Sequence, residues 1–129
     1  MSVRNDLESR LKAWADSQIP PIDVVWEGTS FDKTGSEVPF LQCFIIPGKT
    51  LNATLDASKQ REIGIFQVSV WGIDGKGTYE TENLANQVID LFPVYPKFAQ
   101  TSIDNPMSKS VAEIRGNWRV IHCSASYRR

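Results

Sequence analysis

The sequence predicts an α+β fold, in which two helices pack on one face of a mostly antiparallel sheet of about five or six strands. Three patterns predict this class. Two stretches carry apolar residues at helical spacing, several others alternate or are continuously apolar, and short turns with Gly or Pro separate them. The 129 residues contain no internal repeat, low-complexity segment or linker, so we expect a single domain over 1–129.

Both expected helices have one apolar stripe and a proline at the end. The first is expected over 3–18 and stops at Pro20, because proline lacks a backbone donor and disfavours helix in the preceding residue. Charged residues, Asp6 among them, occupy its other faces. The second is expected over 79–92, with Pro93 terminating it. The two apolar stripes comprise Val3, Leu7, Leu11, Trp14 and Ala15, and Leu84, Ala85, Val88, Leu91 and Phe92.

The remaining apolar stretches are expected to be strands, and they are 22–26, 40–46, 62–71, 98–103, 107–114 and 118–127. Alternation in the third stretch separates two faces. One face carries Phe66, Val68 and Val70, and the other carries Ile65, Gln67, Ser69 and Trp71. The second face therefore mixes apolar and polar side chains. Residues 49–61 are polar, and we expect a long, mobile hairpin loop with extended strand ends there.

The segment from Val68 to Phe92 superficially resembles a phosphate-binding loop between a strand and a helix. A Walker loop requires a glycine five positions before the Gly-Lys pair and a hydroxyl residue directly after the lysine. Here the first position is Val70, and Gly77 follows Lys76. The pattern instead predicts a tight turn that leads into a helix, without a nucleotide site.

No catalytic or metal-binding constellation is predicted. His122 is the single histidine, and no elbow motif surrounds the serines near it. An ordinary half-buried histidine is the expected outcome. Cys43 and Cys123 lie in apolar alternating stretches, so we expect buried, reduced and chemically inert thiols. Two cysteines and one histidine so far apart do not predict a zinc site. We expect no cofactor.

The composition of the chain limits the kinds of partner that it can bind. Fourteen basic and fifteen acidic residues give a net charge of −1, which argues against specific binding of nucleic acid. No apolar run is long enough to span a membrane, and the charged N-terminus lacks the apolar core of a signal peptide, so we expect the chain to stay in the cytosol where it is made. Basic residues gather weakly at Lys49, Lys59 and Arg61 and at the chain end, Arg128 and Arg129. They predict a solvated surface or, as the alternative, contact with an acidic partner or passing DNA.

The order and pattern of the elements carry a family resemblance. A helix, MSVRNDLESRLKAWA, leads through prolines into PPIDVVWEG; the strand PFLQCFIIPG, a polar loop and the strand REIGIFQVSVW follow. A helix ending in NLANQVIDLFP and a last strand, WRVIHCSASYR, complete the pattern. This order resembles the tail terminator-like family of siphophages and prophages, similar in fold to the phage lambda tail terminator. The resemblance covers nearly the whole chain and includes no catalytic signature.

The resemblance implies a structural role in the virion tail for a protein made in the bacterial host cytoplasm. Such proteins form a hexameric ring on the finished tail tube, stop polymerisation of the major tail protein, and present a surface for a head completion or connector protein. Two alternatives stay open: a head–tail joining or tail completion protein of the same assembly, and a small-molecule binding domain of unknown class.

The partner interface is expected to use the 49–61 loop and the second face of the sheet. That face is apolar enough for a contact between subunits and polar enough for a free subunit, and the alternative is that its residues pack under a loop of the same subunit. Trp14 and Trp26 are better explained as core residues. The candidate interface residues are Lys49, Leu51, Leu55, Lys59, Arg61, Ile65, Trp71 and Trp118.

Overall fold

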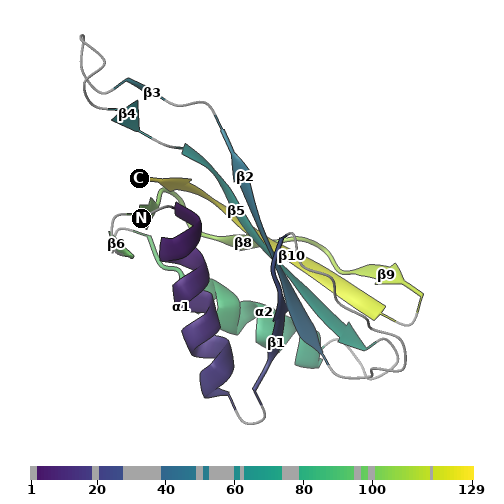
Figure 1. Cartoon of the computed structure of the whole chain (residues 1–129). Helices are drawn as coiled ribbons and strands as arrows, with labels where there is room; N and C mark the ends of the chain where they lie inside the picture. The colour runs from purple at the N-terminus through teal and green to yellow at the C-terminus, as the bar shows by residue number, and fades with distance from the viewer. Residues whose placement is uncertain are drawn as a thin grey trace.

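The computed structural model describes residues 3–18, 21–27, 39–48, 51–52, 60–61, 63–73, 79–94, 97–98, 101–116 and 118–129. Within these ranges the chain forms two α-helices and ten strands (Figure 1). In chain order they are α1 (Val3–Ser17), β1 (Asp23–Val25), β2 (Phe40–Pro47), β3 (Leu51–Asn52), β4 (Gln60–Arg61), β5 (Ile63–Ile73), α2 (Tyr79–Leu91), β6 (Lys97–Phe98), β7 (Thr101–Ile103), β8 (Ser108–Lys109), β9 (Glu113–Arg115) and β10 (Trp118–Arg128).

Two long antiparallel strands, β5 and β10, form the centre of the main sheet. They pair along their whole length, from Ile63 opposite Arg128 to Ile73 opposite Trp118. The sheet has eight strands; its main path runs β1-β2-β5-β10-β7-β6, and β8 and β9 also pair with β10. Only β1 and β2 are parallel among these pairs. The separate β3–β4 pair extends beyond the main sheet, away from both helices (Figure 1).

Alternation along the strands sorts the side chains as the sequence predicts. Phe66, Val68 and Val70 of β5 are buried on one face, and the register places Ile121 and Cys123 of β10 on that same face. One buried cluster joins residues of this face with residues of both helices. The helix residues in it are Val3, Leu7 and Leu11 of α1 and Ala85 and Val88 of α2.

Aromatic side chains and a cation link the helices to the rest of the core. The Phe92 ring, just after α2, meets the Phe66 ring edge-on at 4.8 Å and the Phe98 ring at 5.6 Å. The Arg10 guanidinium of α1 lies 4.5 Å from the centre of the Phe98 ring, and its Nε donates a hydrogen bond of 2.6 Å to the Leu91 carbonyl. Arg10 therefore satisfies a carbonyl at the end of α2 that helix geometry leaves without a partner.

The α+β class and the mostly antiparallel sheet are confirmed, but the strand number is wrong, because the main sheet has eight strands. The error lies in two segments that were each expected to be one strand. The segment 98–103 contains the end of β6 and β7, which pair with each other. The segment 107–114 contains β8 and the start of β9, which pair with successive parts of β10. A long strand can pair with several short ones, and hydrophobic pattern alone does not show where they break.

Asp6 is a second correction. The sequence placed it on the charged side of the first helix, but the residue is buried, with 6% of its surface exposed. Thr101 Oγ1 donates a hydrogen bond of 2.7 Å to Asp6 Oδ2, and Arg129 Nε lies 3.3 Å from the same oxygen. These partners lie 95 and 123 residues away along the chain, beyond the reach of a local pattern.

Candidate partner interface

Of the loop that we expect to form an interface, the structure describes only the two short strands at its base, β3 and β4. Lys49, Leu55 and Lys59 lie outside the described residues, as do the side chains of Leu51 and Arg61. In the backbone, Leu51 faces Arg61 and Asn52 faces Gln60, so the expectation of extended strand ends is confirmed. The Gly48 amide donates a hydrogen bond of 2.7 Å to the Ile63 carbonyl, which links this hairpin to β5. The hairpin therefore projects from the ends of β2 and β5 (Figure 1).

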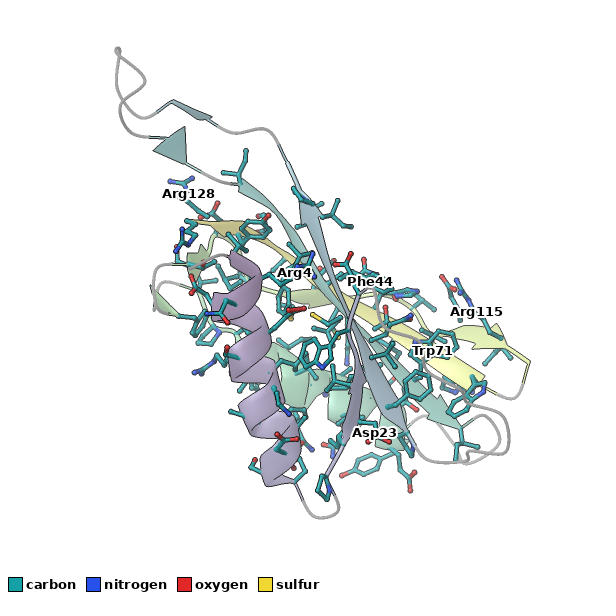
Figure 2. All side chains as sticks on the ribbon, in the orientation of Figure 1. Arg4, Asp23, Phe44, Trp71, Arg115 and Arg128 are labelled. Carbon is teal, nitrogen blue, oxygen red and sulfur yellow. The ribbon has the colours of Figure 1, made fainter. Side chains whose placement is uncertain are left out.

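Trp71 and Trp118 lie together at the other end of the sheet, on the face away from the buried cluster. Both rings contact Phe40: Trp71 stacks on it at 5.4 Å, and Trp118 meets it edge-on at 5.2 Å. Trp71 Nε1 donates a hydrogen bond of 3.2 Å to Gln42 Oε1. The Arg115 guanidinium lies 5.9 Å from the Trp71 ring (Figure 2). Both tryptophans are thus partly covered by their own subunit and are half-buried.

Ile65 is more accessible, and it has a neighbour that sequence reasoning missed. The register pairs Ile65 of β5 with Ile46 of β2, and 45% and 50% of these residues are exposed. Directly opposed side chains on neighbouring strands are close enough to form one patch. The signal for Ile46 was present, since it ends an apolar run and alternates with Ile45. The alternation that separates the two faces of β5 also places Ile46 of β2 on the face opposite Ile45.

The middle of this face is polar and centres on His122. His122 Nδ1 lies 2.7 Å from Ser69 Oγ and 3.4 Å from Gln67 Nε2, and His122 Nε2 lies 3.6 Å from Glu113 Oε1. The expectation of a half-buried histidine is confirmed, with 25% of the side chain exposed.

Ser69, His122 and Glu113 are residue types that also form nucleophile–base–acid sites. Their arrangement here does not suit that chemistry, because only 1% of Ser69 is exposed and a substrate carbonyl has no access to the hydroxyl. A buried polar network of this kind fixes the packing of a sheet face when its members are hydrogen-bonded. We interpret the cluster as the polar centre of the face.

A carboxylate covers part of the outer edge of β2. The neighbouring strand β1 pairs only with Phe40, Leu41 and Gln42. Beyond it, the Ile45 amide donates a hydrogen bond of 2.6 Å to Glu27 Oε1. Arg4 NH1 lies 3.2 Å from the same Glu27 oxygen (Figure 2 labels Arg4). Charged groups on an exposed edge discourage edge-to-edge pairing of sheets, so this contact protects β2.

The arginines at the chain end are paired within the subunit. Arg128 Nε lies 3.3 Å from Asp104 Oδ1, and Arg129 Nε lies 3.3 Å from Asp6 Oδ2. Both arginines therefore already pair with a carboxylate of their own subunit, and contact with an acidic partner or with passing DNA stays a prediction. The lysines of the 49–61 segment lie outside the described residues.

The remaining expectations concern a nucleotide site, the thiols and a metal site. The turn expected at Asp74-Gly75 lies outside the described residues. Beside Gly72 and Ile73 there is a hollow of about 10 Å³, which has room for about one water molecule. Cys43 and Cys123 are buried free thiols, as predicted. Among the residues that the structure describes, no group of three or more metal-ligating side chains comes together, and neither helix is long and apolar enough to cross a membrane.

Comparisons with known proteins give a consistent result. A family profile described as "Phage tail terminator protein" matches residues 2–119. Seven chains of solved structures match the fold. One of them is 24% identical with a TM-score of 0.79, and the alignment covers 98% of this chain and 92% of that chain. This similarity shows the fold alone, and that structure carries no functional name. No curated protein matched.

Proposed function

We propose a function from one established premise: the chain belongs to the phage tail terminator family. Its role is structural, within the phage tail. In our proposal, copies of the chain form a ring, with six copies expected, on the finished end of the tail tube. The ring prevents further addition of the major tail protein and presents a surface to a head completion or connector protein.

The observation that carries this proposal is the family match over residues 2–119, which includes both helices, β1 to β9 and the first two residues of β10. The fold supports it. In our proposal the helices cover one face of the sheet. The other face, which carries Ile46, Ile65 and two half-buried tryptophans, is then left for neighbouring subunits. A face of mixed polarity suits a protein that must stay dissolved before it assembles.

The side chains that could act as nucleophiles are buried, which supports a role without catalysis. The serine that contacts His122 is buried, and both thiols lie in the core, where burial raises the pKa of Cys123 to about 12. A thiol with so high a pKa is almost entirely protonated at neutral pH and is a poor nucleophile.

The proposed interface has two parts. One is the segment that includes Lys49, Leu51, Leu55, Lys59 and Arg61, which extends from the sheet at β3 and β4. The other is the open face with Ile65, Trp71 and Trp118. We propose that the segment contacts a neighbouring subunit or the tail tube, and that the face contributes to the lateral contacts of the ring.

Electron microscopy of the purified full-length chain at high concentration tests the ring directly. Six-fold rings with a central channel are the expected result. The capping role needs a second assay, in which a phage that lacks this gene is complemented and the tail lengths are measured. Normal tail lengths without the gene, together with heads that fail to attach, would favour the alternative of a head–tail joining protein. A purified chain that forms no ring, alone or on isolated tail tubes, would contradict the proposal.

A further inference from the structure

His122 of β10 lies between two parts of the sheet, and each of them contacts a different part of the residue. On one side is the long strand β5. On the other are β8, β9 and the connection between them, residues 108–115, which we call the β8–β9 arm. β9 lies at the end of the sheet away from the β3–β4 hairpin (Figure 1). Every residue of the arm except Ala112 is exposed, so burial contributes little to its attachment and its polar contacts matter more.

Three polar contacts of the arm meet at His122. The Ser110 amide donates a hydrogen bond of 2.8 Å to the His122 carbonyl, and the His122 amide donates one of 3.0 Å to Ser110 Oγ. In the third contact, His122 Nε2 lies 3.6 Å from Glu113 Oε1. The first two contacts involve the backbone of His122 and do not depend on its charge. The third changes in strength when the imidazole gains or loses a proton.

The other ring nitrogen of His122 faces β5. Nδ1 lies 2.7 Å from the hydroxyl of Ser69, a buried residue. A hydroxyl can donate or accept, so Ser69 can contact Nδ1 of a neutral or of a charged imidazole. The Gln67 amide nitrogen lies 3.4 Å from both Nδ1 and Ser69 Oγ, and a glutamine amide can turn either its nitrogen or its oxygen toward them. Strand β5 therefore orients the ring without fixing its charge.

Two charged groups face His122 in the part of the chain that the structure describes, and both come from β9. They are Glu113 and Arg115. Arg115 occupies the second oxygen of the Glu113 carboxylate, with NH2 3.0 Å and Nε 3.2 Å from Oε2, so Oε1 is left facing the imidazole. Lys109 of β8 reaches Asn86 of α2 instead. Strand β5 contributes only the two neutral side chains named above.

We propose that His122 and Glu113 form a pH-sensitive clasp that holds the β8–β9 arm on the sheet. A protonated imidazole attracts the Glu113 carboxylate and tightens the arm. A neutral imidazole loses this attraction, while the backbone contacts with Ser110 and the pair with Arg115 remain. Histidine changes charge between about pH 5 and pH 8, so the arm is held more firmly at the lower end of this range and loosens as pH rises. This inference does not depend on the proposed function.

Amide hydrogen exchange on the full chain measures how firmly the arm is held. The quantity to compare is the protection factor of the Ser110 amide and of the β9 amides, which corrects for the pH dependence of exchange in an unstructured chain. We expect protection at pH 5.5 to exceed protection at pH 8 by about two- to fivefold, the range that a partly exposed ion pair gives.

Two variants each remove one charge of the clasp and keep a side chain that can form hydrogen bonds. In Glu113→Gln and in His122→Gln, the ratio of the two protection factors should fall to about one. Asp16→Asn is the matched control for Glu113→Gln, since it also neutralises an exposed carboxylate, but on α1 and outside the clasp. It should keep the ratio of the parent chain. Circular dichroism and thermal unfolding establish that each variant is folded.

Two outcomes would overturn the clasp. One is equal protection of the arm at pH 5.5 and pH 8 in the parent chain. The other is a ratio that persists in Glu113→Gln, because other titrating groups would then cause it. Glu113 is an exposed residue, so this second test stands even if His122→Gln fails to fold.

Discussion

Cys43 and Cys123 flank Val68 across the three longest strands of the sheet. The register aligns Cys43 of β2 with Val68 of β5, and Val68 with Cys123 of β10. Two strand spacings of about 4.8 Å separate the cysteine backbones by nearly 10 Å, beyond the roughly 7 Å that a disulfide tolerates. The two thiols therefore stay reduced for a geometric reason, and mass spectrometry of the fresh protein should show no bond between them.

The raised pKa values of the same two thiols predict that the folded state loses stability at alkaline pH. Burial raises the pKa of Cys123 to about 12, from an ordinary value of 9.0, and also raises the pKa of Cys43. Below pH 9 both states keep the proton, so there is no pH effect. Between pH 9 and about 12 the unfolded chain loses protons that the folded chain retains, so stability falls as pH rises, by at most about 1.4 kcal/mol per pH unit for each thiol.

Urea unfolding at pH 8 and pH 10 measures this loss. Replacing both cysteines with alanine should lower stability by about 1–2 kcal/mol each at pH 8, as small cavities form. The double variant should then lose less stability between the two pH values than the parent chain. Equal losses in both proteins would show that other groups control the alkaline behaviour.

At the scale of elements, α1 is anchored by a buried charge. The Asp6 side chain is 0% exposed and contacts Thr101 of β7 and Arg129, at distances of 2.7 and 3.3 Å. Removing one partner from a buried ion pair leaves the other charge uncompensated, so Asp6→Ala should lower the free energy of unfolding by about 3 kcal/mol. Urea unfolding measures the loss, and a double-mutant cycle with Arg129→Ala should show strong coupling.

Asp16→Ala is the matched control for this prediction. Asp16 is an aspartate of the same helix whose carboxylate pairs with Lys12 at 3.0 Å, with both side chains at least 60% exposed. An exposed pair contributes little, so the change should stay within about 0.5 kcal/mol. Similar losses for Asp6→Ala and Asp16→Ala would contradict the anchoring role of Asp6.

The contact between α2 and β5 depends on a glycine. A Cβ atom added at Gly72 would lie 2.0 Å from Thr81 Oγ1. Gly72→Ala should therefore push α2 from the sheet and lower stability by about 1–3 kcal/mol, measured by urea unfolding. Thr81→Ala removes the clashing hydroxyl, so the double variant should recover part of the loss. A double variant no more stable than Gly72→Ala alone would place the strain elsewhere.

The elements that the sequence predicted well are those whose signal is local. Helical spacing gave both helices to within a few residues, and alternation gave the two faces of β5. Trp14 and Trp26 pack partly buried against the core, as expected. The sequence could not reveal features that depend on distant partners: Asp6 needs Thr101 and Arg129, and His122 needs Ser69 and Glu113. Strands β8 and β9 appeared as one because only pairing with β10 shows the break between them.

At the scale of the whole molecule, the apolar core and the polar network lie on opposite faces of the sheet. Both helices contribute to the buried cluster, while the polar network around His122 occupies the middle of the other face. Ile46 and Ile65 oppose each other on that face, and about half of each residue is exposed. The β3–β4 hairpin extends farther still, beyond the main sheet (Figure 1). A contact made only by this hairpin can be removed without opening the core.

This separation leads to the last prediction, in which deletion of Asn52 to Ser58 removes termination but not folding. The segment is polar, and in our proposal Leu51 and Leu55, four residues apart in sequence, anchor it on a neighbouring subunit or the tail tube. Ordering it costs about 1–2 kcal/mol per residue, which a polar segment in a free subunit does not recover. The melting temperature should therefore stay nearly unchanged, while electron microscopy should show tails of uncontrolled length.

Replacing the segment with a glycine-serine segment of equal length is the control. This variant preserves the chain length, and it too should fail to terminate tails if the side chains make the contact. Hydrogen exchange on a verified monomer examines the premise, since strongly protected amides from Asn52 to Ser58 would place the segment in the folded core and refute its role in assembly.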